Sequence, residues 1–166
     1  MSRKALMAAL ALIAGLGLAS GVAMAADPPA APGPATPGGK AVIARQVHYK
    51  ELNGAFRALN VELRKDAPDK TVLTASAGQM KDLVAALPGW FPKGSGPEAG
   101  VQTAAKAEIW TDAAGFAAVA TGLQTETAKL AELATAGDLD GLKAQVRVEG
   151  GACKACHDKY REPEKH

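Results

Sequence analysis

Apolar residues recur at alternating steps of three and four positions in four successive segments of this chain. In the segment 40–65 the recurring positions are Val42, Arg45, Tyr49, Leu52, Phe56, Leu59 and Leu63. Because an α-helix has 3.6 residues per turn, this spacing gathers their side chains on one face. The segment is therefore predicted to form a helix whose mainly apolar face packs against other helices.

The second and third segments have the same period. The spaced residues of the second, about 70–87, are Val72, Leu73, Met80, Leu83, Val84 and Leu87. Pro88-Gly89 ends this helix, and residues 88 to about 100 are predicted to form a loop that carries Trp90 and Phe91. The third helix follows the loop, with a seam of Ile109, Ala113, Phe116, Ala120, Leu123, Thr127, Leu130 and Ala134.

The fourth segment, about 139–162, carries both cysteines of the chain. Gly137 is placed to end the third helix, and Asp138 is placed to cap the fourth. The seam of the fourth helix is Leu142, Val146, Glu149, Cys153, Cys156 and Tyr160. With no convincing strand pattern in the chain, the prediction is an all-α fold: an antiparallel up-down-up-down four-helix bundle.

The first 39 residues differ from the rest in composition. Arg3 and Lys4 precede a short apolar run that ends in Ala23-Met24-Ala25, which is typical of a signal peptide over 1–25 that is cleaved before Ala26. An uncleaved N-terminal anchor is the alternative. Residues 26–39 hold five prolines and are predicted to be an extended, disordered linker. The remaining residues, 40–166, are enough for one domain.

The charge of the chain does not point to a partner. Removal of residues 1–25 lowers the number of Lys and Arg from 19 to 17, which equals the number of Asp and Glu. A formal charge of zero gives no support to nucleic-acid binding or to a polybasic membrane contact. We therefore predict neither partner for the mature chain.

Cys153 and Cys156 are two residues apart and are followed at once by His157. A small disulfide loop, a thioredoxin-like redox pair or half of a zinc site would also use such a pair. A thioredoxin-like pair follows a strand, and a zinc site would need more ligands than His48 and His166 supply. Covalent haem attachment is favoured, in which each thiol forms a thioether with a haem vinyl group and His157 supplies the proximal nitrogen of the iron.

The rest of the sequence agrees with a bound haem. On a helix the two cysteines and His157 point within an arc of about 100°, so all three reach one porphyrin. The aromatic residues number only two Trp, two Tyr and three Phe, and a haem would fill the volume that such a core leaves. Gly150 and Gly151 indicate a close approach of the backbone to the porphyrin or a neighbouring helix, or else a kink.

These motifs resemble the class II c-type cytochromes, which comprise cytochrome c-prime and its low-spin, methionine-ligated relatives. The resemblance covers residues 40–162 and rests on RQVHYKELNGAFRAL, LPGWFPKGSG, AEIWTDAAGF and GDLDGLKAQVRVEGGACKACHDKYR. A haem motif at the C-terminal end distinguishes this class from ordinary cytochromes c. The resemblance implies a four-helix bundle around one haem c. The predicted signal peptide indicates export to the periplasm, and we predict no enzymatic activity.

The resemblance also implies roles for single residues. Arg45 and Gln46 match a first-helix pair that hydrogen-bonds a haem propionate, which would satisfy a buried guanidinium. Arg161 matches a residue against the proximal haem face, where it would modulate the iron. Tyr49 stands where the low-spin relatives carry the methionine that binds iron. A bulky side chain that is not a ligand leaves the iron five-coordinate there.

Three side chains remain as alternative distal ligands or neighbours. Tyr49 could bind ferric iron as a phenolate, although uncharged phenols persist at neutral pH. His48 faces a flank of the helix, and a surface or inter-helix position is the more natural role for it. Met80 is expected to pack in the core.

The expected function is reversible binding of nitric oxide and carbon monoxide at a five-coordinate iron, with one-electron transfer as a further capacity. A low-spin, six-coordinate electron carrier is the alternative, and a haem-free thiol-disulfide enzyme is a third hypothesis. A homodimer is expected through the outer face of the first helix, as in the family. The residues of this face are Ile43, Val47, Gly54 and Val61. The redox partner protein is not defined by the sequence.

Overall fold

The structure is a computed structural model that describes residues 31–163, and these contain five α-helices. The helices are α1 Pro37–Glu62, α2 Lys70–Ala86, α3 Glu108–Thr111, α4 Ala113–Ala136 and α5 Leu139–Tyr160. Two short 3-10 helices, Leu87–Trp90 and Pro97–Ala99, lie in the connection between α2 and α3. The predicted signal peptide, the first part of the predicted linker and His166 fall outside the described residues.

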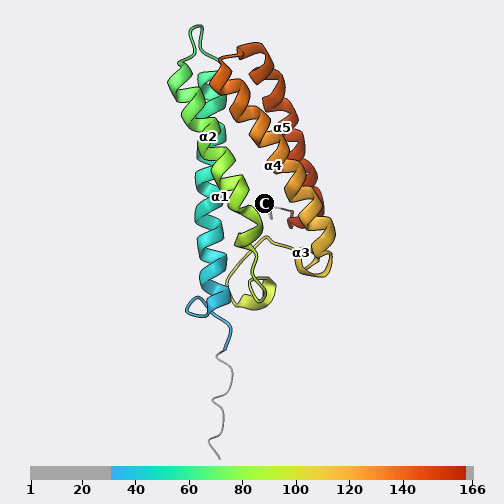
Figure 1. The fold of residues 1–166 in the computed structure, drawn as a ribbon. Helices are drawn as coiled ribbons and strands as arrows, with labels where there is room; N and C mark the ends of the chain where they lie inside the picture. Colours follow the sequence, from blue (N-terminus) through green and yellow to red (C-terminus); the bar gives the residue numbers. More distant parts are fainter. Residues whose placement is uncertain (1–30, 164–166) are drawn as a thin grey trace, which may run out of the picture.

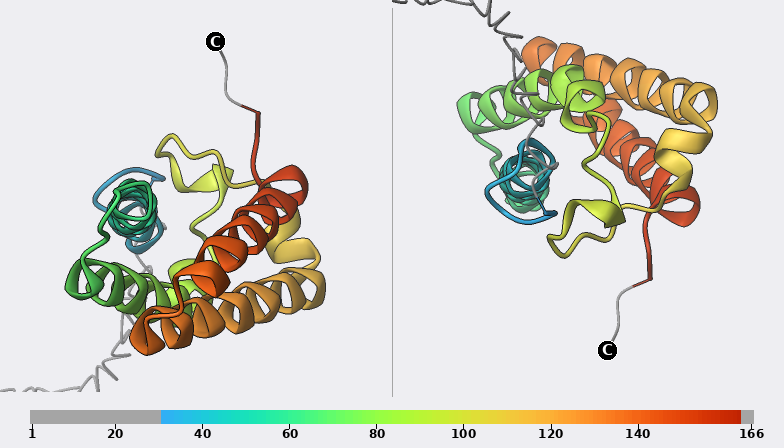
Figure 2. Two further views of the ribbon diagram at one scale, coloured as in Figure 1. Left: turned by 90° about the horizontal axis from the view of Figure 1, so that it is seen from above. Right: turned by 90° about the horizontal axis from the view of Figure 1, so that it is seen from below.

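The four long helices form an antiparallel bundle (Figure 1). Along their backbones α1 packs on α2, α2 on α4, and α4 on α5. Viewed along the bundle, α1 and α5 stand apart, and the segment that connects α2 to α3 lies on this side (Figure 2). The predicted all-α, up-down-up-down bundle is confirmed.

The helix α1 begins at Pro37, three residues before the predicted domain boundary. Thr36 caps it, because its hydroxyl oxygen accepts a hydrogen bond from the backbone N–H of Gly39 at 3.1 Å. Proline suits the first turn of a helix, where the missing N–H would have no intrahelical partner. A Cβ at Gly39 would collide with the carbonyl of Gly33, so the chain before the helix folds back on it. The predicted linker over 26–39 is therefore wrong at its C-terminal end, because residues 37–39 are helical.

The third predicted helix is divided into α3 and α4 at Asp112. The backbone of Asp112 leaves the helical region, with φ −115° and ψ 53°, and its carboxylate accepts a hydrogen bond from Gly115 N at 3.1 Å. Asp112 thus acts as the N-cap of α4. The preceding loop also runs further than the predicted residue 100, because α3 begins only at Glu108. Ile109 and Phe116 are nevertheless both buried, as their places on the seam predict.

The turn between α4 and α5 agrees with the sequence prediction. Gly137 ends α4 in the left-handed region, with φ 76°, where a side chain would be strained. The carboxylate of Asp138 accepts a hydrogen bond from Gly141 N at 2.9 Å and caps α5.

Gly150 and Gly151 are part of an uninterrupted α5. A Cβ added to either would meet no atom of another part of the described protein within 4 Å. The predicted close approach of a neighbouring helix is therefore wrong. The neighbouring helix contacts α5 at other positions, through larger side chains, so these two glycines border open space.

The core of the described residues consists of two clusters. The aliphatic cluster lies toward the α1–α2 and α4–α5 turns and consists of Ala55, Leu59, Leu63, Leu73, Ala77, Met80, Leu130, Ala131, Ala134 and Leu142. The aromatic cluster lies toward the other end and consists of Val84, Leu87, Trp90, Ile109, Phe116, Ala120, Leu123 and Tyr160. Tyr49, Phe91, Trp110 and both cysteines pack against the aromatic cluster, so the predicted attachment motif faces the core.

Candidate haem site

The two cysteines lie on the last two turns of α5, with their side chains half-buried against the aromatic cluster. Both are free thiols rather than a disulfide. Their i, i+3 spacing brings both sulfurs onto one side of the helix. This placement agrees with the prediction that the two thiols reach a single porphyrin.

His157 lies at the surface, on a pocket of about 300 Å³. The other lining residues are Lys106, Asp158, Arg161, Glu162 and Pro163. Partial loss of solvent, together with the charge of Arg161, lowers the pKa of His157. The ring is therefore neutral at neutral pH, as an imidazole must be to bind a metal ion.

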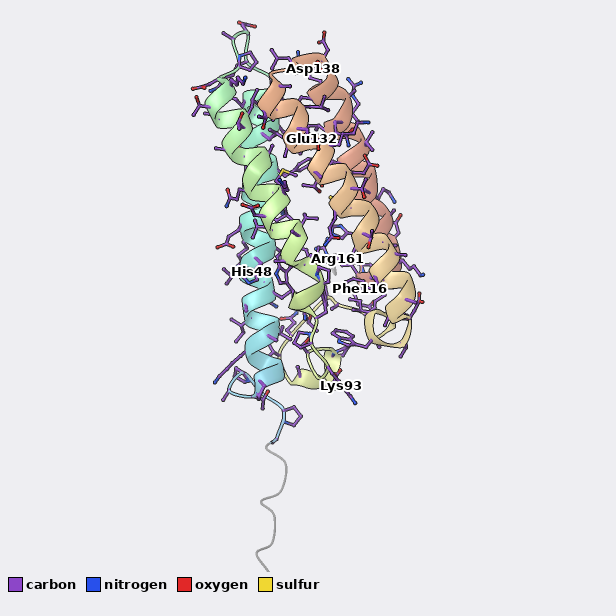
Figure 3. All side chains as sticks on the ribbon, viewed as in Figure 1. His48, Lys93, Phe116, Glu132, Asp138 and Arg161 are labelled. Atoms are coloured by element: carbon purple, nitrogen blue, oxygen red, sulfur yellow. The ribbon has the colours of Figure 1, made fainter. Side chains whose placement is uncertain are left out.

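Backbone hydrogen bonds attach this end of α5 to the segment before α3. Lys106 N donates to the carbonyl of Tyr160 at 3.0 Å, and Glu162 N donates to the carbonyl of Ala104 at 2.8 Å. The position of His157 and Arg161 is thereby fixed relative to the long connection. Figure 3 shows Arg161 and Phe116 in the half of the bundle opposite Asp138, so the site lies away from the α4–α5 turn.

The environment of the thiols differs from that of a redox-active cysteine pair. Burial, with Glu149 and Cys156 acting in the same direction, raises the pKa of the Cys153 thiol to about 11. Burial also raises the pKa of Cys156. A thiol-disulfide enzyme needs a lowered thiol pKa, because the thiolate is the nucleophile. Within residues 31–163 no three His, Cys, Asp or Glu are grouped to hold a metal ion.

Tyr49, on α1, packs against the same aromatic cluster as the two cysteines. Its ring makes an edge contact with Trp90, at 5.2 Å between ring centroids. Burial raises the pKa of Tyr49, and Cys156 acts in the same direction, while Arg45 and Arg161 act against it. The phenol is therefore neutral at neutral pH, which disfavours a phenolate ligand.

The other two candidate ligands are engaged elsewhere. His48 stacks on Trp90 at 4.9 Å between ring centroids, and its Nδ1 lies 3.4 Å from a carboxylate oxygen of Glu51. Met80 is buried in the aliphatic cluster, as predicted. Neither side chain belongs to the group that surrounds the cysteines.

Arg45 is buried, with 3 % of its surface exposed, and is bonded to the connection between α2 and α3. Its Nη1 donates to the Trp90 carbonyl at 3.2 Å and to Ser95 Oγ at 3.1 Å. Its Nη2 donates to the Ser95 carbonyl and to Thr103 Oγ1, both at 3.0 Å. The guanidinium also lies 4.6 Å from the ring centroid of Phe91. A propionate is therefore not needed to satisfy this buried charge, and the propionate role stays a prediction.

Gln46 and Arg161 differ in how closely they approach the cysteines. The side-chain amide of Gln46 donates to the Gln102 carbonyl at 2.9 Å, so it attaches α1 to the same connection as Arg45. Arg161 lines the pocket that contains His157, and its charge acts on both His157 and Tyr49. Of the residues predicted from the family, Arg161 and Tyr49 are thus brought near the attachment motif.

Aromatic rings form a continuous group beneath the cysteines. Phe116 makes edge contacts with Phe91 and with Tyr160, at 4.9 and 5.3 Å between centroids. Trp110 donates from its indole nitrogen to the Phe91 carbonyl at 3.1 Å. Tyr160 donates to a carboxylate oxygen of Asp112 at 3.0 Å, so its hydroxyl is satisfied although its ring is buried.

The site also contains the buried carboxyl group of Glu149 on α5, to which the sequence analysis gave no role. Thr127 on α4 donates to it at 2.8 Å. Both residues stand on seams that are otherwise mostly apolar, and this break in pattern is the signal that could have identified them. Lys106, in the pocket of His157, had no comparable signal because it belongs to an irregular segment.

The donor set fits a covalently bound haem. The two free thiols face the apolar, aromatic interior, where they could form thioethers with a porphyrin. The neutral imidazole of His157, the residue after Cys156, faces an adjacent pocket and could serve as an axial ligand. No other described group supplies an equally suitable set. A four-helix bundle with this motif on its last helix defines a bundle-type c-type cytochrome.

Comparison with known proteins gives the same class. Residues 40–161 match the family described as cytochrome C'. The chain is 38 % identical over 122 residues to cytochrome c' of Alcaligenes xylosoxydans xylosoxydans, covering 73 % of this chain and 92 % of that one. It is 33 % identical over 124 residues to cytochrome c' of Rubrivivax gelatinosus, covering 75 % and 95 %.

A solved structure is similar throughout the bundle. It is the nitric oxide complex of a mutant of cytochrome c prime from Alcaligenes xylosoxidans, with a TM-score of 0.69 and 33 % identity over 76 % of this chain and 97 % of that one. The chain belongs to the cytochrome c' family. Covalently bound haem c follows from this membership and from the two free cysteines.

Proposed function

We propose that this protein is a periplasmic cytochrome that binds nitric oxide and carbon monoxide at a five-coordinate haem iron. Cys153 and Cys156 would hold the porphyrin, and His157 would be the sole axial ligand from the protein. Tyr49 would fill the space on the opposite face. The haem, when bound, supplies the open iron position at which a diatomic gas binds.

The observation that carries this proposal is the position of Tyr49. It packs against the aromatic cluster beside both cysteines, from the helix opposite α5, and its phenol stays protonated. A neutral phenol is a poor ligand but an effective steric barrier in a close-packed interior. Only small molecules would then enter between Tyr49 and the porphyrin.

Two further observations support the proposal. His48 and Met80, which could complete a six-coordinate electron carrier, are held by Trp90 and by the aliphatic cluster. A mutant of a relative from Alcaligenes xylosoxidans was solved as a nitric oxide complex. Gas binding fits both facts better than a low-spin carrier does.

The test is absorption and electron paramagnetic resonance spectroscopy of the haem-loaded protein. We expect high-spin iron in both oxidation states at neutral pH. Tyr49→Met should supply a sulfur ligand from the same position, giving partly low-spin iron and weaker carbon monoxide binding. Tyr49→Ala should bind carbon monoxide faster and more tightly, since no ring has to move.

Tyr49→Phe is the matched control, because it keeps the ring and removes only the hydroxyl. It should leave the spin state unchanged. Low-spin iron in the unmodified protein would refute the five-coordinate site and favour the electron carrier. A change to a new spin state in Tyr49→Phe would instead identify Tyr49 as an iron ligand.

Covalent attachment has a separate test. In the double variant Cys153→Ala with Cys156→Ala, acidified organic solvent should extract the haem, whereas the unmodified protein should retain it. Retention of covalent haem by the double variant would refute the assignment of the motif. A purified protein with thiol-disulfide activity and no haem absorption would establish the third hypothesis.

Export to the periplasm is tested by sequencing the N-terminus of the protein recovered from a periplasmic extract. We expect it to begin at Ala26. A product that begins at Met1 and remains with the membrane would establish the uncleaved anchor. No helix among residues 31–163 is long and apolar enough to cross a membrane.

A further inference from the structure

The helix that carries the cysteines also buries a carboxyl group. Glu149 lies one turn before Cys153, about 6 Å along the helix axis, and only 1 % of its surface is exposed. Its Oε1 accepts a hydrogen bond from Thr127 Oγ1 at 2.8 Å. Its Oε2 is buried and has no hydrogen-bond partner. An ionised carboxylate with one oxygen unpaired is costly in such a place, so the geometry favours the neutral acid.

The negative charge of Glu126 also favours the neutral acid. Glu126, on α4 beside Thr127, is itself fixed by a hydrogen bond of 2.7 Å from Gln145 Nε2. Burial first, and then the negative charge of Glu126, raise the pKa of Glu149, while the bond from Thr127 lowers it. On α5 itself a negative charge on Glu149 acts on Cys153 and helps to raise its pKa.

Other charged groups in the bundle have partners of their own. The buried charges of α1 are Arg45, which is bonded to the α2–α3 connection, and Glu62, which pairs with Lys65 at 2.7 Å. Within the described residues, α2 buries no charged side chain. The charge of Arg161 acts on Tyr49, whereas the pKa of Glu149 responds to burial, Thr127 and Glu126. No buried cation of the described residues is bonded to Glu149, so the hydrogen bond from Thr127 is what remains to stabilise a negative charge there.

We propose that Glu149 links the oxidation state of the haem iron to proton binding, releasing a proton when the iron is oxidised and taking one up when it is reduced. The inference rests on the proposed haem attachment at Cys153. On reduction, a one-electron donor gives one electron to ferric iron and the Glu149 carboxylate takes one proton from solvent. On oxidation the O–H bond of the acid breaks, the proton returns to solvent and the electron leaves to an acceptor.

The sign follows from electrostatics. A ferric porphyrin carries one more positive charge than a ferrous porphyrin, and this charge stabilises a nearby carboxylate strongly in a low-dielectric interior. Glu149 therefore ionises more readily in the ferric protein. Between the pH values at which it ionises in the two states, the reduction potential should fall as pH rises. The limiting slope is about 59 mV per pH unit, because one pH unit is a tenfold change in proton concentration for a one-electron couple.

The experiment is potentiometric titration of the haem-loaded protein across a range of pH. In the unmodified protein the potential should fall with pH across the window bounded by the two pKa values of Glu149, and the upper end of this window, set by the ferrous protein, should lie above the ordinary titration range of glutamate, because burial raises the Glu149 pKa. In Glu149→Gln the potential should be flat through that window. The amide keeps the volume of the side chain and an oxygen for Thr127, so a merely structural role for Glu149 would not predict this change.

Two further variants keep the test decisive if Glu149→Gln folds poorly. Thr127→Val removes the hydrogen bond from Oε1 and should move the window to higher pH. Glu126→Gln, the matched control, should keep the slope and move the window to lower pH, because a repelling charge is lost. Infrared difference spectra between the two oxidation states should show a protonated carboxyl band that disappears in Glu149→Gln.

The outcomes separate this inference from the proposed function. Protein that carries no covalent haem would refute the proposed function. Haem-loaded protein with a pH-independent potential would refute the role of Glu149 alone. So would an unchanged slope in Glu149→Gln, or an unmoved window in both Thr127→Val and Glu126→Gln, since another group would then bind the proton.

Discussion

Arg45 connects α1 to the irregular segment between α2 and α3, and its removal should loosen that segment. In Arg45→Met the side chain keeps its length and apolar stem but loses every hydrogen-bond donor. Ser95 Oγ still donates to the Pro92 carbonyl at 2.8 Å, and Thr103 Oγ1 still accepts from Ala105 N at 3.2 Å. The carbonyls of Trp90 and Ser95, by contrast, lose the bonds that the side chain provides.

The cost follows from these two buried carbonyl groups. Each buried acceptor without a partner costs about 1–3 kcal/mol, so Arg45→Met should lower the free energy of unfolding by about 4 kcal/mol. The lost contact with Phe91 adds about 1–2 kcal/mol, because the guanidinium is desolvated. For a domain whose total stability is about 5–15 kcal/mol, this is a large fraction.

The assay is urea unfolding of the haem-loaded protein, together with amide hydrogen exchange over residues 90–103. Gln46→Ala is the matched control, since its single hydrogen bond to the same connection is at the surface and its removal should cost less than about 1 kcal/mol. Exchange in residues 90–103 should accelerate in Arg45→Met and change little in the control. A loss in Arg45→Met no greater than in Gln46→Ala would refute the reasoning. A change confined to the haem absorption would identify the propionate as the partner of Arg45.

Three further predictions concern other parts of the bundle. Gly151→Ala should raise the free energy of unfolding by about 1 kcal/mol, because the site lies in a helix with open space around it; a lower thermal midpoint would show that the porphyrin contacts this glycine. Val47→Asp should abolish the predicted homodimer in sedimentation velocity, whereas Val148→Asp, at an equally exposed valine of α5, should not; a monomeric unmodified protein would refute the dimer. Hydrogen bonds from Lys159 first, and then from Tyr160, lower the pKa of Asp112, so its stabilising effect is present above the ordinary aspartate pKa and is lost as pH falls through the folded value. Asp112→Asn should therefore be less stable than the unmodified protein in urea at pH 7, with the difference disappearing in strong acid.

The helices could be predicted because the bundle imposes one physical rule on them. A residue such as Leu59 or Leu130 is buried only if it returns to the same face every three or four positions, and this rule is visible in the sequence. The rule does not reveal where a helix is interrupted. Asp112 divides α3 from α4, yet Ile109 and Phe116 on either side of it both face the core. The seam continues across the break, so its spacing alone could not show it.

The attachment motif was predictable because its chemistry is local, whereas the surroundings of Arg45 were not. The partners of its guanidinium lie 45 to 58 residues away, in a segment without periodic structure. Only the tertiary fold brings them together. Family resemblance supplied a propionate partner for this residue, and the structure supplies four protein acceptors in its place. Both arrangements satisfy a buried cation, so the residue type by itself does not distinguish them.

The two clusters of the core separate the stability of the fold from the properties of the haem site. Each long helix places a side chain with at most 1 % exposure in the aliphatic cluster, namely Leu59, Met80, Leu130 and Leu142. These side chains are buried against one another, so the core at this end of the bundle does not depend on a cofactor. Tyr49 and Glu149 lie outside that cluster, beside the cysteines. Substitutions at these two positions should therefore change spin state, gas affinity and reduction potential more than they change the free energy of unfolding. If they changed the haem properties and the free energy of unfolding equally, the haem itself would organise the bundle.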